Sequence, residues 1–349
     1  MLSAYDAASH QRWRETLCAA FADFHWTVLT LPPRYFSWRI RGNSLSWAYR
    51  QRDVLTRDYD IVIATSMVDL SALRGLVPAL AAIPTLVYFH ENQFAYPQRS
   101  LQFSSVEPQM LNLYTALAAD TIAFNSAYNR DTFLQGVEQL LAKMPDQVPA
   151  GIVCRLAERS LILPVPVACA GSSHRTAVSA GPLQLLWNHR WEYDKAPERL
   201  FAALKRLLAQ PVDRHLHDLQ LHIVGQQFRQ SPPVFAQMKT WLDRHHPGVV
   251  KHWGYLASQR DYRRLLGQAD VVISTAVHDF QGLAVIEAVA AGCIPAVPDR
   301  LCYGEWFAQR YRYHSSPQQP EQEADALAAH LLQLAAQKRQ GRLPATPDV

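Results

Sequence analysis

The sequence predicts an α/β protein built from two doubly wound parallel sheets that a linker joins. Short apolar runs alternate with helical patterns, a Pro-, Ser- and Ala-rich break follows residue 167, and the same alternation resumes after it. At 349 residues the chain is also too long for one compact core. We therefore expect a first domain at 1–168, a linker at 169–182, a second domain at 183–315 and a C-terminal helix and tail at 316–349.

In the first domain, apolar runs bounded by Pro, Asp or polar turns predict the strands. The opening residues MLSAYD supply only two residues for a first strand, so we expect that strand to be very short or the true start to lie upstream. Strand and helix alternation of this kind indicates βαβ units and a parallel sheet. Further strands are expected at 26–32, 59–66, 84–89 and 120–125, with helices at 9–23 and 107–119.

The second domain repeats the pattern. Ligands of such sheets bind outside the carboxyl ends of the strands, so the loops after these strands are where chemistry is expected. With two such sheets, we expect that site to lie in a cleft between the domains. The predicted strands are 183–188, 219–225, 249–254, 270–275 and 294–298, and helices are expected near 195–209, 232–245, 258–268 and from about 282.

Composition describes an ordinary soluble globular protein. Hydrophobic residues make up 49% and charged residues 18%, and the net charge of +4 does not by itself imply a nucleic-acid partner. No apolar run approaches the roughly 20 residues that a membrane span requires. Five scattered cysteines, without a CxxC pair or a metal-binding spacing, fit reduced thiols. We therefore expect a cytoplasmic protein without a membrane partner or a metal site.

The most specific pattern in the second domain is the string from Asp279 to Glu287, DFQGLAVIE, which follows an expected strand and begins a helix near Gly282. A helix N-terminus carries free N–H groups and a positive dipole end, so it binds anionic oxygens. Gly282, between Gln281 and Leu283, permits close backbone approach. Glu287 is placed to bind ribose hydroxyls. A surface glutamate on an ordinary helix is the alternative, but the complete string after a strand favours a site.

Two cations follow the first strand of this domain, in LLWNHRWEYDK. Arg190 and Lys195 suit a diphosphate, because arginine can bind two oxygens at once and lysine acts as a point charge. Two solvated surface residues are the alternative. Gly225 ends a neighbouring strand in HIVGQQF, on the same expected edge of the sheet, which favours the diphosphate interpretation.

These motifs resemble the GT-B fold and the retaining glycosyltransferases of family 4. Those enzymes carry a Glu-x7-Glu motif and then an Ala- and Gly-rich turn, seen here in EAVAAGCIP, and Arg190 and Lys195 match the family's cations for the donor diphosphate. Two positions depart from the pattern: the first acid is Asp279, one methylene shorter, and Gln281 replaces the phenylalanine of a Phe-Gly pair. The resemblance implies that Asp279 contacts the donor sugar.

Over most of residues 1–315 the resemblance narrows to the tRNA-queuosine mannosyltransferases. It is carried by SAYDAASHQRWRE, by YFHENQFAYP and by the long segment that contains the string from Asp279 to Glu287. The resemblance implies transfer of mannose from GDP-mannose, with retention, to the cyclopentene diol of queuosine in the anticodon loop of a tRNA for aspartate. No cofactor or metal is then expected, and the partners are a queuosine-containing tRNA and a nucleotide sugar.

The stretch HENQFAYP, directly after an apolar strand, is the most specific part of this match. Retaining GT-B enzymes place a histidine beside the donor sugar, and a neutral imidazole at position 90 could bond a hydroxyl without adding charge. A capped strand end and ordinary core aromatics are the alternatives. We expect His90 to be catalytic and the acceptor to contact Glu91, Asn92, Gln93, Phe94 and Tyr96.

Near the N-terminus, Asp6 and His10 follow the short first strand in SAYDAASHQRW. They could hold acceptor hydroxyls. For His10, a solvent-exposed position in the first turn of a helix is an equal alternative.

An RNA partner predicts a basic and aromatic surface. Residues 34–57 contain six arginines, one acid at Asp53, and five interleaved aromatics. Arginines neutralise phosphates and aromatics stack on unpaired bases, although arginine stems that cover aromatics in a solvated loop are the alternative. We expect acceptor contacts from Arg39, Arg41 and Arg50.

Two other functions stay open. One is a family 4 enzyme with another sugar or acceptor, such as a lipid, a polysaccharide or galactosyl-queuosine. A membrane acceptor would predict a basic amphipathic helix in the first domain, whereas residues 34–57 are aromatic-rich and interrupted by Gly42. The other is a non-catalytic RNA-binding protein that retains a nucleotide pocket.

Overall fold

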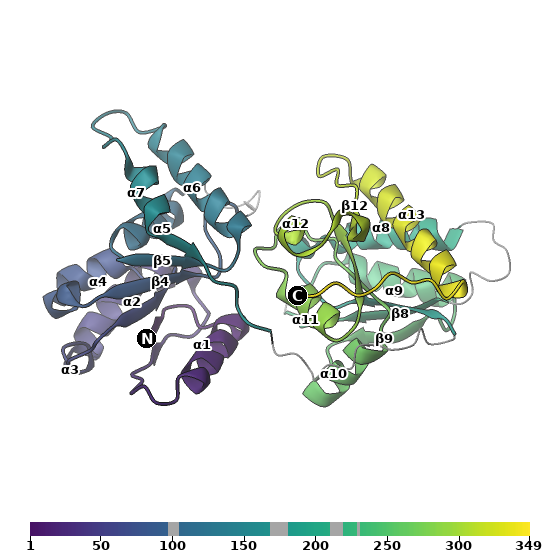
Figure 1. The fold of residues 1–349 in the computed structure, drawn as a ribbon, viewed down its shortest axis with the longest axis horizontal. Helices are drawn as coiled ribbons and strands as arrows, with labels where there is room; N and C mark the ends of the chain where they lie inside the picture. The colour runs from purple at the N-terminus through teal and green to yellow at the C-terminus, as the bar shows by residue number, and fades with distance from the viewer. Residues whose placement is uncertain (97–104, 168–180, 210–218, 229–230) are drawn as a thin grey trace. The chain divides into compact units, whose positions relative to one another are not determined.

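The computed structural model describes residues 1–96, 105–167, 181–209, 219–228 and 231–349. Its chain divides into two compact units, Met1–Pro166 and Val167–Val349. Each unit contains one six-stranded sheet in which every pair of neighbouring strands is parallel (Figure 1). The two-sheet α/β architecture is confirmed, while residues 169–180 of the expected linker lie outside the described ranges.

The first sheet has the order β2-β1-β3-β4-β5-β6, so the chain runs first towards one edge and then, from β3 onwards, towards the other. The first strand has only two residues, as predicted, and it pairs with both β2 and β3. Strand β6 was not predicted. The strands are β1 (Leu2–Ser3), β2 (Leu29–Thr30), β3 (Val62–Thr65), β4 (Thr85–Phe89), β5 (Thr121–Phe124) and β6 (Ser160–Ile162).

Helices α2, α4 and α5 pack against one another, and Figure 1 shows β4 and β5 between α5 and α1. The alternation along β4 explains how the two sides are filled, because successive side chains of a strand point to opposite faces. Tyr88 stacks on Trp13 of α1, whereas Phe89 contacts Phe124 and Phe133. The helices are α1 (Ala8–Ala20), α2 (Phe36–Arg50), α3 (Arg52–Leu55), α4 (Leu70–Leu76), α5 (Glu107–Leu117), α6 (Ala127–Leu141) and α7 (Ile152–Glu158), with a 3-10 turn at Pro78–Ala82.

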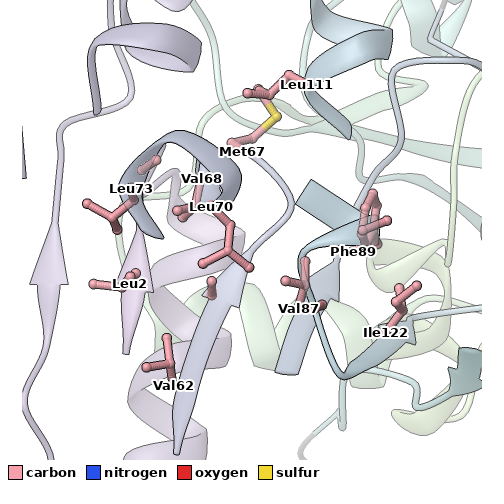
Figure 2. Packing of buried hydrophobic residues seen from close by; sticks show 14 of the residues in the cluster. Leu2, Val62, Met67, Val68, Leu70, Leu73, Val87, Phe89, Leu111 and Ile122 are labelled. Carbon is pink, nitrogen blue, oxygen red and sulfur yellow. The ribbon is translucent and has the colours of Figure 1, made fainter. Parts of the chain in front are cut away.

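Apolar side chains from the strands and from the loops at their carboxyl ends form the core of the first unit. Figure 2 shows Val62 and Val87 from the strands in one cluster with Met67, Val68 and other residues that follow β3. Burial of these side chains stabilises the unit by about 25 cal/mol per Å² of apolar surface. The loop after β3 is therefore anchored in the core by its own apolar residues.

The prediction that Gly42 interrupts the segment at 34–57 is wrong. Residues Phe36–Arg50 form a continuous helix, α2, with Gly42 in its interior. A glycine there costs the helix only about 1 kcal/mol, which tertiary contacts can offset. Asn43, the next residue, supplies such contacts, because its buried amide bonds the carbonyl of Met67 and accepts from the backbone N–H of Asp69.

The second sheet has the order β12-β11-β10-β7-β8-β9, in which the direction of winding reverses between β7 and β10. Only the edge strand β12 was not predicted. The strands are β7 (Leu183–Trp187), β8 (Leu219–Val224), β9 (Val250–Gly254), β10 (Val271–Ile273), β11 (Ile294–Pro298) and β12 (Arg312–Tyr313).

The C-terminal helix α13 packs along α8 within the second unit, as Figure 1 shows. No helix among the described residues combines the length and apolar character needed to span a membrane. The helices are α8 (Pro197–Ala209), α9 (Val234–His245), α10 (Gln259–Gln268), α11 (Leu283–Ala290), α12 (Tyr303–Trp306) and α13 (Pro320–Arg339), with 3-10 turns at Tyr193–Lys195 and Gln309–Tyr311.

Candidate active site

The predicted donor residues meet where the second sheet changes direction. Strands β7 and β10 are hydrogen-bonded neighbours there, with Leu185 opposite Val271. Open α/β sheets bind ligands at the carboxyl ends of the two strands that flank such a point. Arg190 and Lys195 follow β7, and Asp279 with Gly282 follows β10. The two motif segments, which are far apart in the sequence, thus belong to one site.

Lys195 and Asp279 form the centre of this site. The Lys195 ammonium donates to the carbonyl of His278 at 2.8 Å and lies 3.3 Å from the Asp279 carboxylate and 3.2 Å from that of Asp194. Burial alone would lower the pKa of Lys195, but Asp279 and Asp194 outweigh burial and raise it. Burial likewise tends to raise the pKa of Asp279, yet Lys195 and then His189 bring it below its usual value. Both side chains are therefore charged.

Asp279 also holds the entry to helix α11. One carboxylate oxygen accepts from the backbone N–H of Gly282 at 3.0 Å, and the other lies 3.4 Å from the Tyr303 hydroxyl. A short aspartate fits this local bond, because it reaches a backbone N–H three residues on, as in capped turns. The acid that departs from the family pattern thus has a structural role as well as a place in the site.

Two glycines predicted at the site are required by its geometry. Gly282 has φ +78° and begins α11, and a Cβ there would lie 2.9 Å from the Tyr303 ring. Gly225 has φ +154°, and a Cβ there would lie 1.8 Å from the backbone oxygen of His189. The loops after β7 and β8 therefore approach closely only because Gly225 has no side chain.

Glu287 lies on α11 and accepts a hydrogen bond from the Tyr262 hydroxyl of α10 at 3.4 Å. The same hydroxyl accepts from the Asn188 amide at 3.0 Å, and that amide also donates to the carbonyl of Ala284 at 2.7 Å. Asn188 and Tyr262 were not predicted from the sequence. Asn188 follows β7 directly, so its position at the end of a strand could have marked it as a candidate site residue. No sequence pattern marked Tyr262.

His189 is a second residue that sequence reasoning missed. It is buried, and burial first and Lys195 second lower its pKa to about 4, so it is neutral at pH 7. Within the described part of the chain no group hydrogen-bonds its Nε2. A neutral imidazole beside Lys195 and Asp279 can accept or donate one hydrogen bond without changing the charge of the site.

The charge around the two predicted cations is not simply positive. Arg190 is half-exposed. Its guanidinium forms an ion pair with Glu192 at 2.6 Å and lies 3.9 Å from the carboxylate of Asp194. Lys195 already faces two carboxylates and a carbonyl. A diphosphate would therefore draw on Arg190 and on the N-terminus of α11 beside Leu283, as well as on a rearranged Lys195. Gln281, also predicted, is buried next to Gly282.

In the first unit, His90 follows β4 directly, as predicted, and is buried. Its ring stacks on that of His10 with centroids 4.2 Å apart, and the ring of Trp13 lies nearly perpendicular to it, with centroids 4.8 Å apart. Burial, and then His10, lower the pKa of His90 well below its usual value. Among the described residues no group hydrogen-bonds His90 Nε2. His90 is thus a neutral imidazole whose ring is held in place by its neighbours.

His10 is not a solvent-exposed helix residue. It is buried in the first turn of α1, and its Nδ1 lies 2.9 Å from the carbonyl of Tyr5. A carbonyl only accepts, so Nδ1 carries the proton and Nε2 is free to accept. Burial lowers the pKa of His10, with opposition from Glu91. Asp6 forms an ion pair with Arg14 at 3.0 Å.

The prediction that Asn92 contacts the acceptor is wrong. Its amide is fully buried and donates to Asn129 and Thr132, and its carbonyl oxygen accepts from the backbone N–H groups of Phe94 and Ala95. These bonds occupy the whole side chain. Asn92 folds the loop after β4 rather than binding a ligand.

Asn92 is one end of a buried amide chain. The Asn129 amide donates to the Asn125 side chain at 2.8 Å and to the carbonyl of Phe89 at 2.9 Å. The Asn125 amide in turn donates to the carbonyl of His90 at 2.9 Å. Connected amides in a buried setting strengthen one another. This chain, which we call the asparagine relay (Asn92, Asn129 and Asn125), fixes the backbone of His90.

Phe94 is half-buried and packs against the core of the first unit. It packs edge-on against Phe133 at 5.6 Å and covers Gly136, where a Cβ would lie 2.3 Å away. Gln93 is half-buried and its backbone N–H donates to Asn112. Glu91 is half-buried, and its carbonyl accepts from Ser66, while Tyr96 is exposed. Of this predicted group, the contacts of the acceptor with Glu91, Gln93, Phe94 and Tyr96 stay predictions.

The three predicted arginines differ in environment. Arg39 is buried, which contradicts its assignment to a phosphate contact. Arg41 is half-exposed but pairs with Asp69, the N-cap of α4, and with Glu107 in the first turn of α5. Arg50 is exposed at the end of α2. Only the last of the three is a straightforward phosphate ligand.

Within the described ranges no three His, Cys, Asp or Glu side chains are grouped as a metal site would require. Chemically, the second unit offers a carboxylate for hydroxyls and positive groups for a leaving diphosphate. The first offers a neutral imidazole at a strand end.

Comparison with known families and proteins gives two matches that together span almost the whole chain. Residues 1–167 match the N-terminal domain model of tRNA-queuosine alpha-mannosyltransferase, and residues 174–342 match the model of glycosyl transferases group 1. A tRNA-queuosine alpha-mannosyltransferase of Drosophila melanogaster is 31% identical over 300 residues, which cover 83% of this chain and 76% of that protein.

Solved structures share the fold at low identity. Anabaena HepE in complex with UDP and glucose has a TM-score of 0.59 at 15% identity, over 94% of this chain and 82% of that one. An Escherichia coli structure described as trehalose-6-phosphate bound with UDP-2-fluoro glucose has a TM-score of 0.59 at 16% identity, over 87% and 71%. The two parallel-sheet units and these neighbours together identify the GT-B fold.

Proposed function

The chain belongs to the tRNA-queuosine alpha-mannosyltransferase family, and on that premise we propose that it transfers mannose from GDP-mannose to queuosine in the anticodon loop of a tRNA for aspartate, with retention of configuration. The observation that carries the proposal is the gathering of Lys195, Asp279 and Glu287 at the switch point of the second sheet. A nucleotide sugar carries hydroxyls for the carboxylates and a diphosphate for the cation. The polar residues after β4 can hydrogen-bond the hydroxyls of a diol.

On the donor side, Glu287 receives the ribose hydroxyls while the hydroxyl of Tyr262 holds its carboxylate in position. Arg190 and the N-terminus of α11 receive the diphosphate, and Lys195 turns from its carboxylate partners towards it. Asp279 faces the sugar while it keeps the backbone N–H of Gly282. These cationic and amide groups stabilise the negative charge that the leaving phosphate develops, without a metal ion.

The chemical step needs no protein nucleophile. The bond from the sugar to the leaving phosphate oxygen breaks to give an oxocarbenium-like centre, and the queuosine hydroxyl attacks from the same face. The departing phosphate oxygen accepts the proton of that hydroxyl. His90, held neutral by burial and by His10, bonds a sugar or acceptor hydroxyl and orients it without placing a positive charge beside the developing cation.

The experiment combines the protein with a queuosine-containing tRNA and, separately, GDP-mannose, GDP-glucose, UDP-galactose and UDP-glucose. Mass spectrometry of the digested nucleosides reads out a hexose on queuosine. We expect the gain with GDP-mannose, and loss of that gain in Glu287→Ala, with tRNA binding and folding unchanged. Wild-type turnover by Glu287→Ala would refute the assigned donor site.

Two other functions predict different results. A family 4 enzyme with another sugar or acceptor would leave queuosine unmodified by GDP-mannose, or would modify it with UDP-galactose. A non-catalytic RNA-binding protein would retain tRNA but release no GDP from any donor. The buried, charged pair of Lys195 and Asp279 at the switch point of the sheet favours an enzyme over a non-catalytic RNA-binding protein, because charged groups with perturbed pKa values cluster at active sites.

A further inference from the structure

Helix α2 carries an aromatic ring that lies flat on its backbone. A Cβ built on Gly42 would lie 2.5 Å from Cε2, 2.6 Å from Cζ2 and 2.7 Å from Cδ2 of Trp38, one turn earlier. Cε2 and Cδ2 are the carbons shared by the two rings of the indole. Three similar distances to these atoms mean that the face of Trp38, rather than its edge, rests on Gly42.

The opposite face of that ring is open. Trp38 is 52% exposed although one face rests on the helix. A glycine inside a helix costs about 1 kcal/mol relative to alanine. The sequence places this glycine four residues after Trp38, where a Cβ would displace the ring.

More exposed aromatic and apolar surface lies on the same side of α2. Trp38, Leu45 and Tyr49 are spaced by seven and then four residues, which brings them to one face of a helix. Leu45 is 49% and Tyr49 72% exposed. Soluble proteins rarely expose such a row of large side chains without a partner.

The charge around this face selects the kind of partner. Residues 34–57 contain six arginines and one acid, and five of the arginines are exposed, at positions 34, 41, 50, 52 and 57. Flat rings interleaved with arginines are the groups that bind unpaired nucleotides, since rings stack on bases and guanidinium groups bind phosphates. A purely apolar protein partner would not call for those arginines.

The fold places the start of α2 at the sheet edge that carries His90. The ring of Phe36 meets Tyr5, which follows β1, at 5.9 Å. Further along the helix, Asn43 bonds the carbonyl of Met67 in the loop after β3. Both contacts are at the carboxyl ends of parallel strands, and β4 ends at the same edge with His90.

We propose that Trp38, held flat by Gly42, is a stacking platform for an unpaired base of the RNA loop that the enzyme modifies. This inference deepens the proposed function, because it rests on an RNA acceptor with unpaired bases beside the modified nucleotide. Tyr49 extends the platform, and Arg50 at the end of the helix binds a phosphate of the loop. Sequence composition indicated residues 34–57 as a whole. Only the structure shows that Trp38 and Tyr49 are exposed on α2 whereas Arg39 is buried.

The test measures binding of a fluorescent anticodon stem-loop RNA and of a fully paired duplex of equal length, without nucleotide sugar. We expect Trp38→Ala to weaken stem-loop binding by roughly 5- to 100-fold, as loss of one base stack does, and to change duplex binding little. Trp38→Phe keeps a flat face and should recover part of the loss. Gly42→Ala, in which the new methyl group displaces the ring, should weaken stem-loop binding while the helix stays folded.

Tyr114→Ala is the matched control, since Tyr114 is equally exposed at 52% but lies on α5. It should bind both RNAs like the wild type. The platform is overturned if Trp38→Ala and Gly42→Ala bind the stem-loop like the wild type, or if they lose stem-loop and duplex binding alike. Circular dichroism of each variant verifies that the fold is unchanged.

Failure of this inference can be told apart from failure of the proposed function. If the wild type transfers mannose but Trp38→Ala and Gly42→Ala keep full loop binding, the stacking platform is refuted and the proposed activity is supported. If the wild type transfers no sugar from any donor but both variants lose loop binding selectively, the stacking platform is supported as part of an RNA-binding protein and the proposed activity is refuted.

Discussion

The imidazole rings of His10 and His90 lie stacked, with centroids 4.2 Å apart and planes inclined by 21°. Two histidines at this distance cannot both be protonated at low cost, because like charges in a buried setting repel. One ring comes from the first helix and the other from the end of β4. The stack therefore joins the N-terminal segment to the candidate catalytic residue.

From this relationship we predict that His90 stays neutral at pH values where an ordinary histidine, with a pKa near 6.5, becomes protonated. Burial is the larger cause and His10 the second. NMR spectra that report imidazole nitrogen shifts should show no titration of His90 from about pH 8 to about pH 6. His10→Leu keeps an apolar neighbour but removes the second imidazole, so it should raise the pKa of His90. Titration of wild-type His90 near 6.5 would contradict the prediction.

The lowered pKa values of His10 and His90 also predict how the free energy of unfolding changes at acid pH. The folded-state pKa of His10 and of His90 is lowered, so below about 6.5 the unfolded chain binds more protons than the folded one. Stability from these groups is complete above that pH and is lost as the pH falls. Each group contributes a slope of up to about 1.4 kcal/mol per pH unit.

A second prediction concerns the asparagine relay. Asn125→Leu removes the donor to the carbonyl of His90 and one acceptor of Asn129, which leaves buried polar groups without partners. We expect a loss of about 1–3 kcal/mol in the free energy of unfolding. Because the backbone of His90 loses its anchor, kcat should fall about tenfold or more while the KM for the sugar donor changes little. Urea denaturation and steady-state kinetics measure the two effects.

The control for that variant is Val137→Ala, a buried position further along α6. It should destabilise the unit by a comparable amount, since it leaves a small cavity, but it does not touch the relay. Equal losses of kcat in both variants would show that stability alone, and not the position of His90, explains the change.

A third prediction separates the two roles of Asp279. Asp279→Asn keeps an oxygen that can accept from the backbone N–H of Gly282 but removes the charge beside Lys195. If Asp279 also faces the donor sugar, we expect kcat to fall by about a hundredfold. Binding of GDP alone, measured by calorimetry, should stay within a few-fold of the wild type, because no sugar is present.

Asp194→Asn removes a charge at a similar distance, 3.2 Å, from the same ammonium. It should reduce kcat much less than Asp279→Asn. Equal losses of kcat in the two variants would show that the effect comes from the charge balance around Lys195 and not from a contact between Asp279 and the sugar.

A fourth prediction concerns Tyr262, which bridges Asn188 and Glu287. Tyr262→Phe removes one hydrogen bond to the carboxylate and leaves the ring in place. We expect the KM for the nucleotide sugar to rise by about 2- to 10-fold with kcat nearly unchanged, as for the loss of a positioning bond. Tyr255→Phe, an exposed tyrosine of the same unit, should behave like the wild type. A large drop in kcat would instead give Tyr262 a part in the chemical step.

The sequence was sufficient for those parts of the molecule that a local pattern specifies. Asp279, Gly282 and Glu287 occupy one loop and one helix, so their spacing predicted their place after β10. Lys195 and Asp279 could be associated because both follow strands that a doubly wound sheet brings together. The fold class followed from apolar runs of strand length, which are strong signals in buried parallel sheets.

The wrong predictions share a physical cause. Asn92 and Arg39 have side chains that suit a ligand, but composition does not reveal which way a side chain points. All hydrogen-bonding groups of the Asn92 side chain are taken by local backbone groups and by partners on α6, more than thirty positions away. Helix α2 was missed because Gly42 lowers helix propensity locally, and its compensation by the bonds of Asn43 to Met67 and Asp69 is a tertiary effect.

The last prediction tests how the C-terminal helix is held in the second unit. Lys338 of α13 pairs with Asp270 at the start of β10 and donates to the carbonyl of Pro182, and both ionic side chains are almost fully buried. Asp270 also accepts from the backbone N–H of Gln184 at 2.8 Å, at the start of β7. Lys338→Met removes one charge and leaves the other buried, so unfolding of this unit should require about 3–5 kcal/mol less.

The double variant Lys338→Met with Asp270→Asn is the decisive comparison for this pair. It removes both charges and keeps an oxygen for the backbone N–H of Gln184, so it should recover a large part of the stability that Lys338→Met loses. Thermal denaturation of wild type, both single variants and the double variant gives the coupling energy. Additive losses would mean that the two charges act independently and that α13 is held by its apolar contacts with α8. Recovery would instead show that the buried pair ties the end of the chain to the two strands, β7 and β10, that flank the donor site.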